Sequence, residues 1–152
     1  MRCVHDIIDL PVIDAQEGKE VGIIIDVVIE SGINQIAGVV LKSNQQEYLV
    51  PLEQLYSLGA DYIIIKELYQ LLAIDSQDLL TGQKLIGTPV VTSDGDSLGV
   101  VKDILLTEKG ELNGYELSDG LVQDILTGRE ILTADQEITY GDQKMIINNS
   151  IN

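Results

Sequence analysis

The chain contains no tryptophan and no phenylalanine, and its only aromatic side chains are six tyrosines. With one cysteine and one histidine, it can form no internal disulfide and cannot supply the Cys and His ligand sets that hold zinc. The densest apolar run, Val21–Ile29, is short and includes Asp26, so no membrane insertion is expected. Residues Met1–Leu10 carry two aspartates where a signal peptide would need an apolar stretch, and a cytoplasmic location is expected.

Positive charge is also scarce. Nine Lys and Arg residues face 25 Asp and Glu residues, which gives a formal net charge of −16. Nucleic-acid affinity comes largely from Lys and Arg that displace counterions from phosphate, so direct nucleic-acid binding is not expected. The preferred interpretation of the negative charge is that it keeps the protein soluble. The alternative is that it attracts a basic protein partner or cations.

The sequence is rich in aliphatic side chains and contains an internal repeat. Hydrophobic residues make up 45% of the chain, mostly Ile, Val and Leu, which suits a buried core. Four blocks recur in the same order in both halves. The pairs are Ile7–Ile13 with Leu85–Val91, Gly18–Ile29 with Gly95–Leu106, Ile36–Leu41 with Leu112–Leu117, and Tyr48–Ile65 with Glu130–Ile147.

The repeat predicts two domains, residues 1–67 and 81–152, joined by a connector over residues 68–80. Each copy consists of short β-branched runs broken by turn residues, a pattern typical of an all-β sandwich or small barrel. The connector is rich in Leu and Gln and lacks Pro and Gly, so it could form a short helix.

Two glycines and two aspartates occupy equivalent places in the copies. Gly22 and Gly99 open a strand, where close approach of a neighbouring backbone is expected. Asp26 and Asp103 each interrupt an apolar strand, and a buried carboxylate needs hydrogen-bond partners. We expect a β-bulge after each aspartate and a carboxylate that accepts backbone N–H bonds, which is a structural role; a catalytic pair is the weaker alternative.

The copies differ most in one insertion: Lys42–Glu47 is six residues long, whereas Ser118–Arg129 is twelve. Four apolar side chains of the insertion fall on one face of a helical stretch between two glycines. They are Leu121, Val122, Ile125 and Leu126. This face either covers an open barrel end or forms an exposed docking patch for a protein.

No catalytic set is predicted. His5, the one histidine, lies in an N-terminal segment that is expected to be mobile, so a nucleophilic triad is excluded. Asp119 and Asp124 are an acid pair that could perform general acid–base work only if they shared a pocket. No metal site and no cofactor are expected.

The chain resembles the PRC-barrel superfamily at these same blocks. The resemblance lies in Pro11-Val12 followed by Gly18–Ile29, in Pro89-Val90 followed by Gly95–Leu106, and in Tyr48–Leu52 leading to the turn at Gly59-Ala60-Asp61. Members include the cytoplasmic part of the photosynthetic reaction centre H subunit and the C-terminal domain of the ribosome-maturation factor RimM. The resemblance implies two tandem small β-barrels, a habit of docking in larger assemblies, and no catalytic residues to carry over.

These observations together predict a non-catalytic interaction or adaptor module in the cytoplasm of a bacterium or archaeon. Its partner would be a protein, for which the acidic field favours a basic surface. An unpaired sheet edge or apolar patch could also make a homodimer. Two other functions stay open: a regulator that binds a small molecule or metal ion, and an acid-pair hydrolase.

Overall fold

A computed structural model describes residues 2–30, 36–67, 71–118, 131–133, 138–141 and 143–147, with the backbone alone at 131–133. The described residues form two seven-stranded sheets. The first has the spatial order β6 (Leu55–Leu58), β7 (Ile63–Ile65), β2 (Pro11–Asp14), β3 (Lys19–Ile29), β4 (Ile36–Ser43), β5 (Gln46–Pro51) and β8 (Leu72–Ala73). The second has the order β12 (Ile131–Thr133), β11 (Leu112–Ser118), β10 (Ser97–Leu106), β9 (Pro89–Thr92), β14 (Met145–Ile147) and β13 (Ile138–Tyr140). Its seventh strand, β1 (Arg2–Cys3), pairs with β10.

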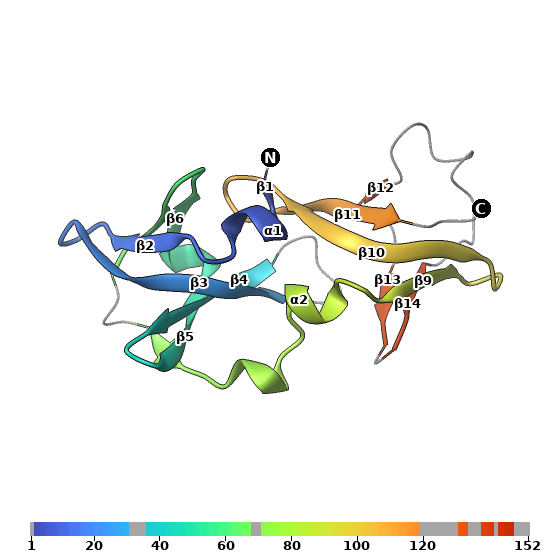
Figure 1. Ribbon diagram of the computed structural model, residues 1–152, viewed down its shortest axis with the longest axis horizontal. Helices are drawn as coiled ribbons and strands as arrows, with labels where there is room; N and C mark the ends of the chain where they lie inside the picture. The colour runs from blue at the N-terminus through green and yellow to red at the C-terminus, as the bar shows by residue number, and fades with distance from the viewer. Residues whose placement is uncertain are drawn as a thin grey trace.

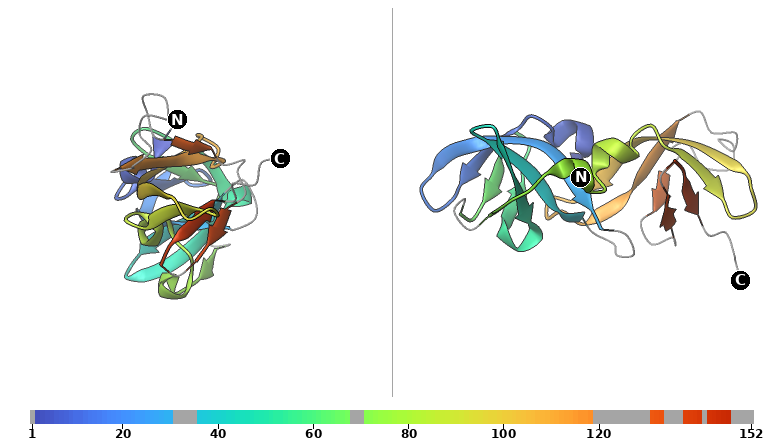
Figure 2. Two further views of the ribbon diagram at one scale, coloured as in Figure 1. Left: turned by 90° about the vertical axis from the view of Figure 1, so that its right-hand side faces the viewer. Right: turned by 90° about the horizontal axis from the view of Figure 1, so that it is seen from below.

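The two sheets repeat one topology. In each sheet, one short strand, β2 or β9, forms an antiparallel hairpin with the long strand that follows it, β3 or β10. The same short strand also pairs in parallel with a late strand of its repeat, β7 or β14. Each sheet curls into its own lobe, and the two lobes lie end to end (Figures 1 and 2). The prediction of an all-β protein with two tandem barrel-like domains is confirmed.

Glycine turns close the first hairpin of each repeat. Gly18 and Gly95 have φ of 68° and 95°, a left-handed conformation that glycine adopts without steric cost.

The core is aliphatic, as the composition requires. Buried Ile, Leu and Val side chains from both sheets belong to one hydrophobic cluster, so the lobes share a core instead of keeping two separate ones. Tyr115 is the one fully buried aromatic side chain among the described residues, and its hydroxyl lies 2.6 Å from that of Tyr140. This pairing satisfies a polar group that burial would otherwise make costly.

The described part of the connector contains no α-helix. β8 pairs with β5 at the edge of the first sheet, and a 3-10 helix, η3 (Ser76–Asp78), follows it. Lys84 then donates from Nζ to the carbonyl oxygens of Gln77 and Leu79, which ties the connector to the second repeat. The expected boundaries at residues 67 and 81 stay a prediction. A second 3-10 helix, η1 (Leu52–Gln54), links β5 to β6.

Candidate functional site

The two repeats exchange their first helices. The short helix α1 (Val4–Ile7) belongs to the first repeat, yet β1 directly before it pairs with β10 of the second, with Cys3 opposite Leu105. The equivalent helix α2 (Gly82–Leu85) follows Thr81, which forms a bridge with Val28 on β3 of the first repeat. Both helices lie at the centre of the molecule, between the lobes (Figure 1). Each repeat therefore lends its first helix to the long strand of the other.

The two predicted aspartates hold these exchanged helices. Asp26 Oδ1 accepts hydrogen bonds from its neighbour Val27 N at 2.9 Å and from Gln83 N of α2 at 3.0 Å. Asp103 Oδ1 accepts from Ile104 N at 2.8 Å and from His5 N of α1 at 3.3 Å. Both residues are at most 9% exposed, so these bonds form where water competes little. Each carboxylate thus joins the two repeats.

The expected bulge directly after each aspartate is wrong in position. The ladder register shifts just before the aspartate, between Ile24 and Asp26 and between Val101 and Asp103. A second shift comes only at the far end of the strand, between Val28 and Ile29 in the first repeat. The extra residue therefore lies at Ile25, so Asp26 starts the shifted segment with its carboxylate beside the incoming helix.

His5 is fixed in place, which corrects the prediction of a mobile segment. It lies on α1, and its Nδ1 is 2.7 Å from Asp103 Oδ2. Since a carboxylate can only accept a hydrogen bond, Nδ1 carries the proton of this bond, and Nε2 takes no part in it. The equivalent side chain, Gln83, donates from Nε2 to the Ile25 carbonyl oxygen. The repeat alignment places His5 opposite Gln83, and that was the signal that could have pointed to a shared role.

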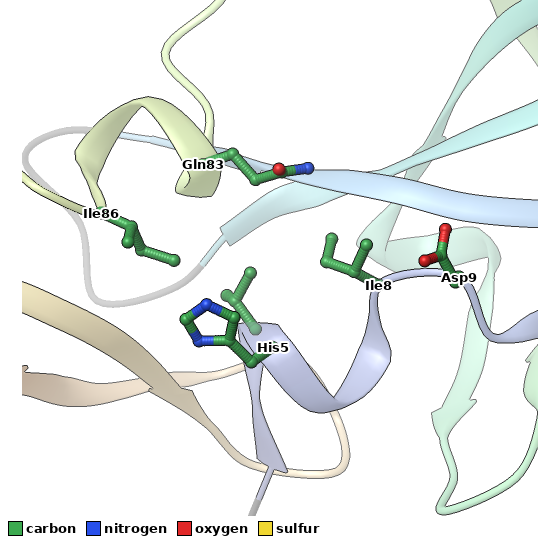
Figure 3. A pocket seen from close by; sticks show the side chains of 6 residues that line it. His5, Ile8, Asp9, Gln83 and Ile86 are labelled. Carbon is green, nitrogen blue, oxygen red and sulfur yellow. The ribbon is translucent and has the colours of Figure 1, made fainter.

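A pocket of about 300 Å³ lies at this junction. It is lined by residues of both helices and the turns that follow them, namely Val4, His5, Ile8, Asp9, Gln83 and Ile86. Figure 3 shows His5 between Ile8 and Ile86, with Gln83 reaching in from α2 and Asp9 beyond Ile8. The wall is thus partly aliphatic and partly polar.

The strand-opening glycines are needed for different reasons. A Cβ at Gly22 would lie 2.3 Å from the carbonyl oxygen of Lys42 on the neighbouring strand, so the expected close approach holds there. Gly99 instead has φ of 123°, a conformation that residues with a side chain rarely adopt. Equivalent sequence positions therefore use glycine once for space and once for backbone conformation.

Cys3 is expected to react slowly with alkylating reagents. Burial, together with the hydrogen bond that its thiol donates to Asp6 and the charge of Asp103, raises its pKa from 9.0 to about 12. The thiolate is the nucleophile, so at pH 8 its alkylation by iodoacetamide should be roughly a hundredfold or more slower than that of a free thiol peptide. Mass spectrometry of timed reactions measures this, with the urea-unfolded protein as control. A native rate equal to the unfolded rate would contradict the prediction.

Several predicted residues lie outside the described part of the chain. They are the apolar insertion face of Leu121, Val122, Ile125 and Leu126, and the acid pair of Asp119 and Asp124. Among the described residues, no group of three or more His, Cys, Asp or Glu side chains is arranged to hold a metal ion. No described helix is long and apolar enough to cross a membrane.

Sequence reasoning missed one surface feature. Tyr56 and Tyr62, on the β6–β7 hairpin, are 58% and 48% exposed. Alternation could have placed Tyr62 on the outer face with Ile64, because Ile63 and Ile65 point into the core.

The comparisons agree with the repeat. The PRC-barrel domain family matches residues 2–72 and, a second time, residues 78–150. No curated protein matches the chain significantly. The family matches cover nearly all of the sequence; the first contains β2 to β7 and the second contains β9 to β14. The chain therefore belongs to the PRC-barrel family and carries two copies of that domain in tandem.

Proposed function

We propose that this protein is a non-catalytic cytoplasmic adaptor that binds a partner protein with a basic surface. The observation that carries the proposal is the exposure of two tyrosines on the β6–β7 hairpin, Tyr56 and Tyr62, which together we call the tyrosine face. Tyrosine is enriched at protein interfaces because it buries a large, fairly rigid ring and keeps a polar hydroxyl. Of the five tyrosines in the described part of the chain, these two have side chains that are largely exposed to solvent.

The tyrosine face is held in place by the fold. β6 and β7 pair antiparallel, and the turn between them is closed by a hydrogen bond from Gly59 N to the carbonyl oxygen of Tyr62. Lys66 Nζ lies 5.6 Å from the centroid of the Tyr56 ring. In the second repeat the equivalent hairpin exposes Ile146, which is 39% exposed. Each lobe thus offers apolar surface on the same hairpin, at a separation fixed by the exchanged helices.

The use of the buried carboxylates supports a role without catalysis. Asp26 and Asp103 accept backbone N–H bonds, and Asp14 accepts from Gln16 N and Glu17 N. These carboxylate oxygens are occupied by hydrogen bonds that hold the backbone, which is a structural role. The charge of −16 favours a basic partner, since opposite charge raises the rate of encounter.

Replacing both Tyr56 and Tyr62 with serine is expected to weaken partner binding at least tenfold, because aromatic side chains contribute most of the energy of many interfaces. The wild-type protein, immobilised, would first capture its partner from the native cell by cross-linking. Affinity would then be measured with the purified partner by calorimetry. Melting temperature should stay within a few degrees of the wild-type value, since both side chains are exposed.

The matched control is Leu72→Ser, which removes an apolar side chain that is 73% exposed at the opposite edge of the same sheet. It should bind as the wild type does. A third variant shortens Ser118–Arg129 to the length of Lys42–Glu47 and tests the predicted insertion patch directly. If only this variant loses binding, the insertion is the docking surface and the tyrosine face is not. Unchanged affinity of the double serine variant would refute the assignment.

A further inference from the structure

The junction pocket differs in chemistry between its two sides, although the helices that form it are equivalent. The first repeat contributes His5 and Asp9 where the second has Gln83 and Gly87. A pocket needed only to join the repeats could use the same residues twice. The asymmetry therefore points to a role for the polar groups of the first repeat.

Asp9 adopts a conformation that suits glycine better. Its φ is 72°, and the equivalent residue, Gly87, has φ of 94°. The left-handed region costs residues with a Cβ some free energy, although Asp tolerates it better than most. Asp9 is exposed, and its carboxylate forms no ion pair with a described residue. Its side chain thus carries a steric cost that no described salt bridge offsets, and it lines the pocket.

The polar groups that remain for a ligand are acceptors. His5 uses Nδ1 toward Asp103, so a neutral ring has its lone pair on Nε2. Gln83 donates from Nε2 to Ile25, which leaves its Oε1 to accept. Asp9 adds a negative charge, and Ile8 and Ile86 add aliphatic wall (Figure 3).

We propose that this pocket binds an organic cation with an aliphatic stem, an alkylammonium group. The ammonium would donate its hydrogen bonds to the acceptors and pair with the Asp9 carboxylate, while the stem packs against the isoleucines. The net charge of −16 concentrates cations around the protein and repels anions, which favours the same ligand class. The group could come from a free amine or from a lysine side chain of another protein, and the proposal does not depend on the tyrosine face.

The test uses butylamine as the probe at pH 8.5, where the amine is still charged. Because His5 is the only histidine, its ring C–H resonances report on the pocket without ambiguity. Saturable shifts of these resonances and of the Gln83 side-chain amide are expected. The uncharged analogue 1-butanol should bind about two- to fivefold more weakly, the size expected for one exposed charge pair.

Asp9→Gly is the decisive variant, because it removes the carboxylate and also relieves the backbone conformation. Butylamine affinity should fall about two- to fivefold, while the melting temperature should stay the same or rise. Asp61→Asn removes the same charge from an exposed turn residue outside the pocket and should leave the affinity unchanged. The proposal is overturned if Asp9→Gly binds as well as the wild type, if Asp61→Asn weakens binding equally, or if no saturable shift occurs.

A comparison of probes distinguishes the two sources of the cation. N-acetyl-lysine methylamide presents the ammonium as a protein side chain would, with peptide groups at its base. Tighter binding of this compound than of butylamine assigns the pocket to lysine of a protein partner, and the reverse order assigns it to a free amine. Either ranking of the two affinities supports an ammonium ligand, provided that the binding of both compounds depends on Asp9.

Discussion

Replacing Asp103 with alanine is expected to lower the free energy of unfolding by about 2–4 kcal/mol, because two backbone N–H groups lose a buried acceptor. The carboxylate accepts from His5 N and Ile104 N through one oxygen and from His5 Nδ1 through the other. Asp103→Asn keeps one acceptor and should cost less, about 1–2 kcal/mol. Urea unfolding followed by circular dichroism measures both values.

The equivalent Asp26→Ala variant should lose a similar amount, because Gln83 N and Val27 N depend on it. Since each aspartate holds the helix of the other repeat, either change should destabilise both lobes in a single transition. Asp14→Ala is the control: it also removes a buried carboxylate, but its bonds to Gln16 N and Glu17 N stay within one repeat. Amide exchange at His5 should accelerate in Asp103→Ala and not in Asp14→Ala. An unchanged melting temperature for Asp103→Ala would remove the structural role.

Gly22→Ala is expected to destabilise the protein by about 2–4 kcal/mol, toward the upper end of the cost of overpacking. The new Cβ would lie 2.3 Å from the Lys42 carbonyl oxygen and 2.7 Å from Leu41 Cδ1. The carbonyl belongs to the adjacent strand β4, so it can move only by disturbing the β3–β4 pairing. Chemical denaturation of the purified variant measures the loss.

Gly18→Ala separates this steric effect from the backbone effect. A Cβ at Gly18 would meet nothing within 4 Å, and the cost there comes only from its φ of 68°. About 1 kcal/mol is expected from that conformation. If Gly22→Ala costs no more than Gly18→Ala, the strands can separate locally and the close approach is not what requires glycine.

The helix exchange supports the adaptor proposal because it makes the two lobes rigid relative to each other. Domains joined only by a small polar interface, as is common within one chain, can move relative to each other. Here the lobes share one hydrophobic cluster, and Leu58 N and Arg2 Nε add further bonds between them, to the Glu108 and Leu58 carbonyl oxygens. Two equivalent hairpins held at a fixed separation suit a partner that offers two sites, because the second contact then forms at a high effective concentration.

Much of the fold could be predicted from the sequence. The ordered repeat blocks predicted two copies of one β topology, and the absence of Trp and Phe required an aliphatic core. The sequence also predicted a structural role for Asp26 and Asp103, because a carboxylate in a buried apolar strand needs hydrogen-bond partners. The bulge was misplaced because strand alternation shows that a residue is out of pattern and does not show on which side the extra residue lies.

The sequence by itself determined the duplication, the β class and the need for hydrogen bonds at the two aspartates, because these follow from local periodicity and from the cost of burying charge. Only the tertiary structure decided which groups supply those bonds. His5 and Asp103 are 98 positions apart, and α1 reaches β10 only because the two repeats exchange helices. The pocket beside Asp9 exists for the same reason, since its walls come from segments that meet only once both lobes have folded against each other.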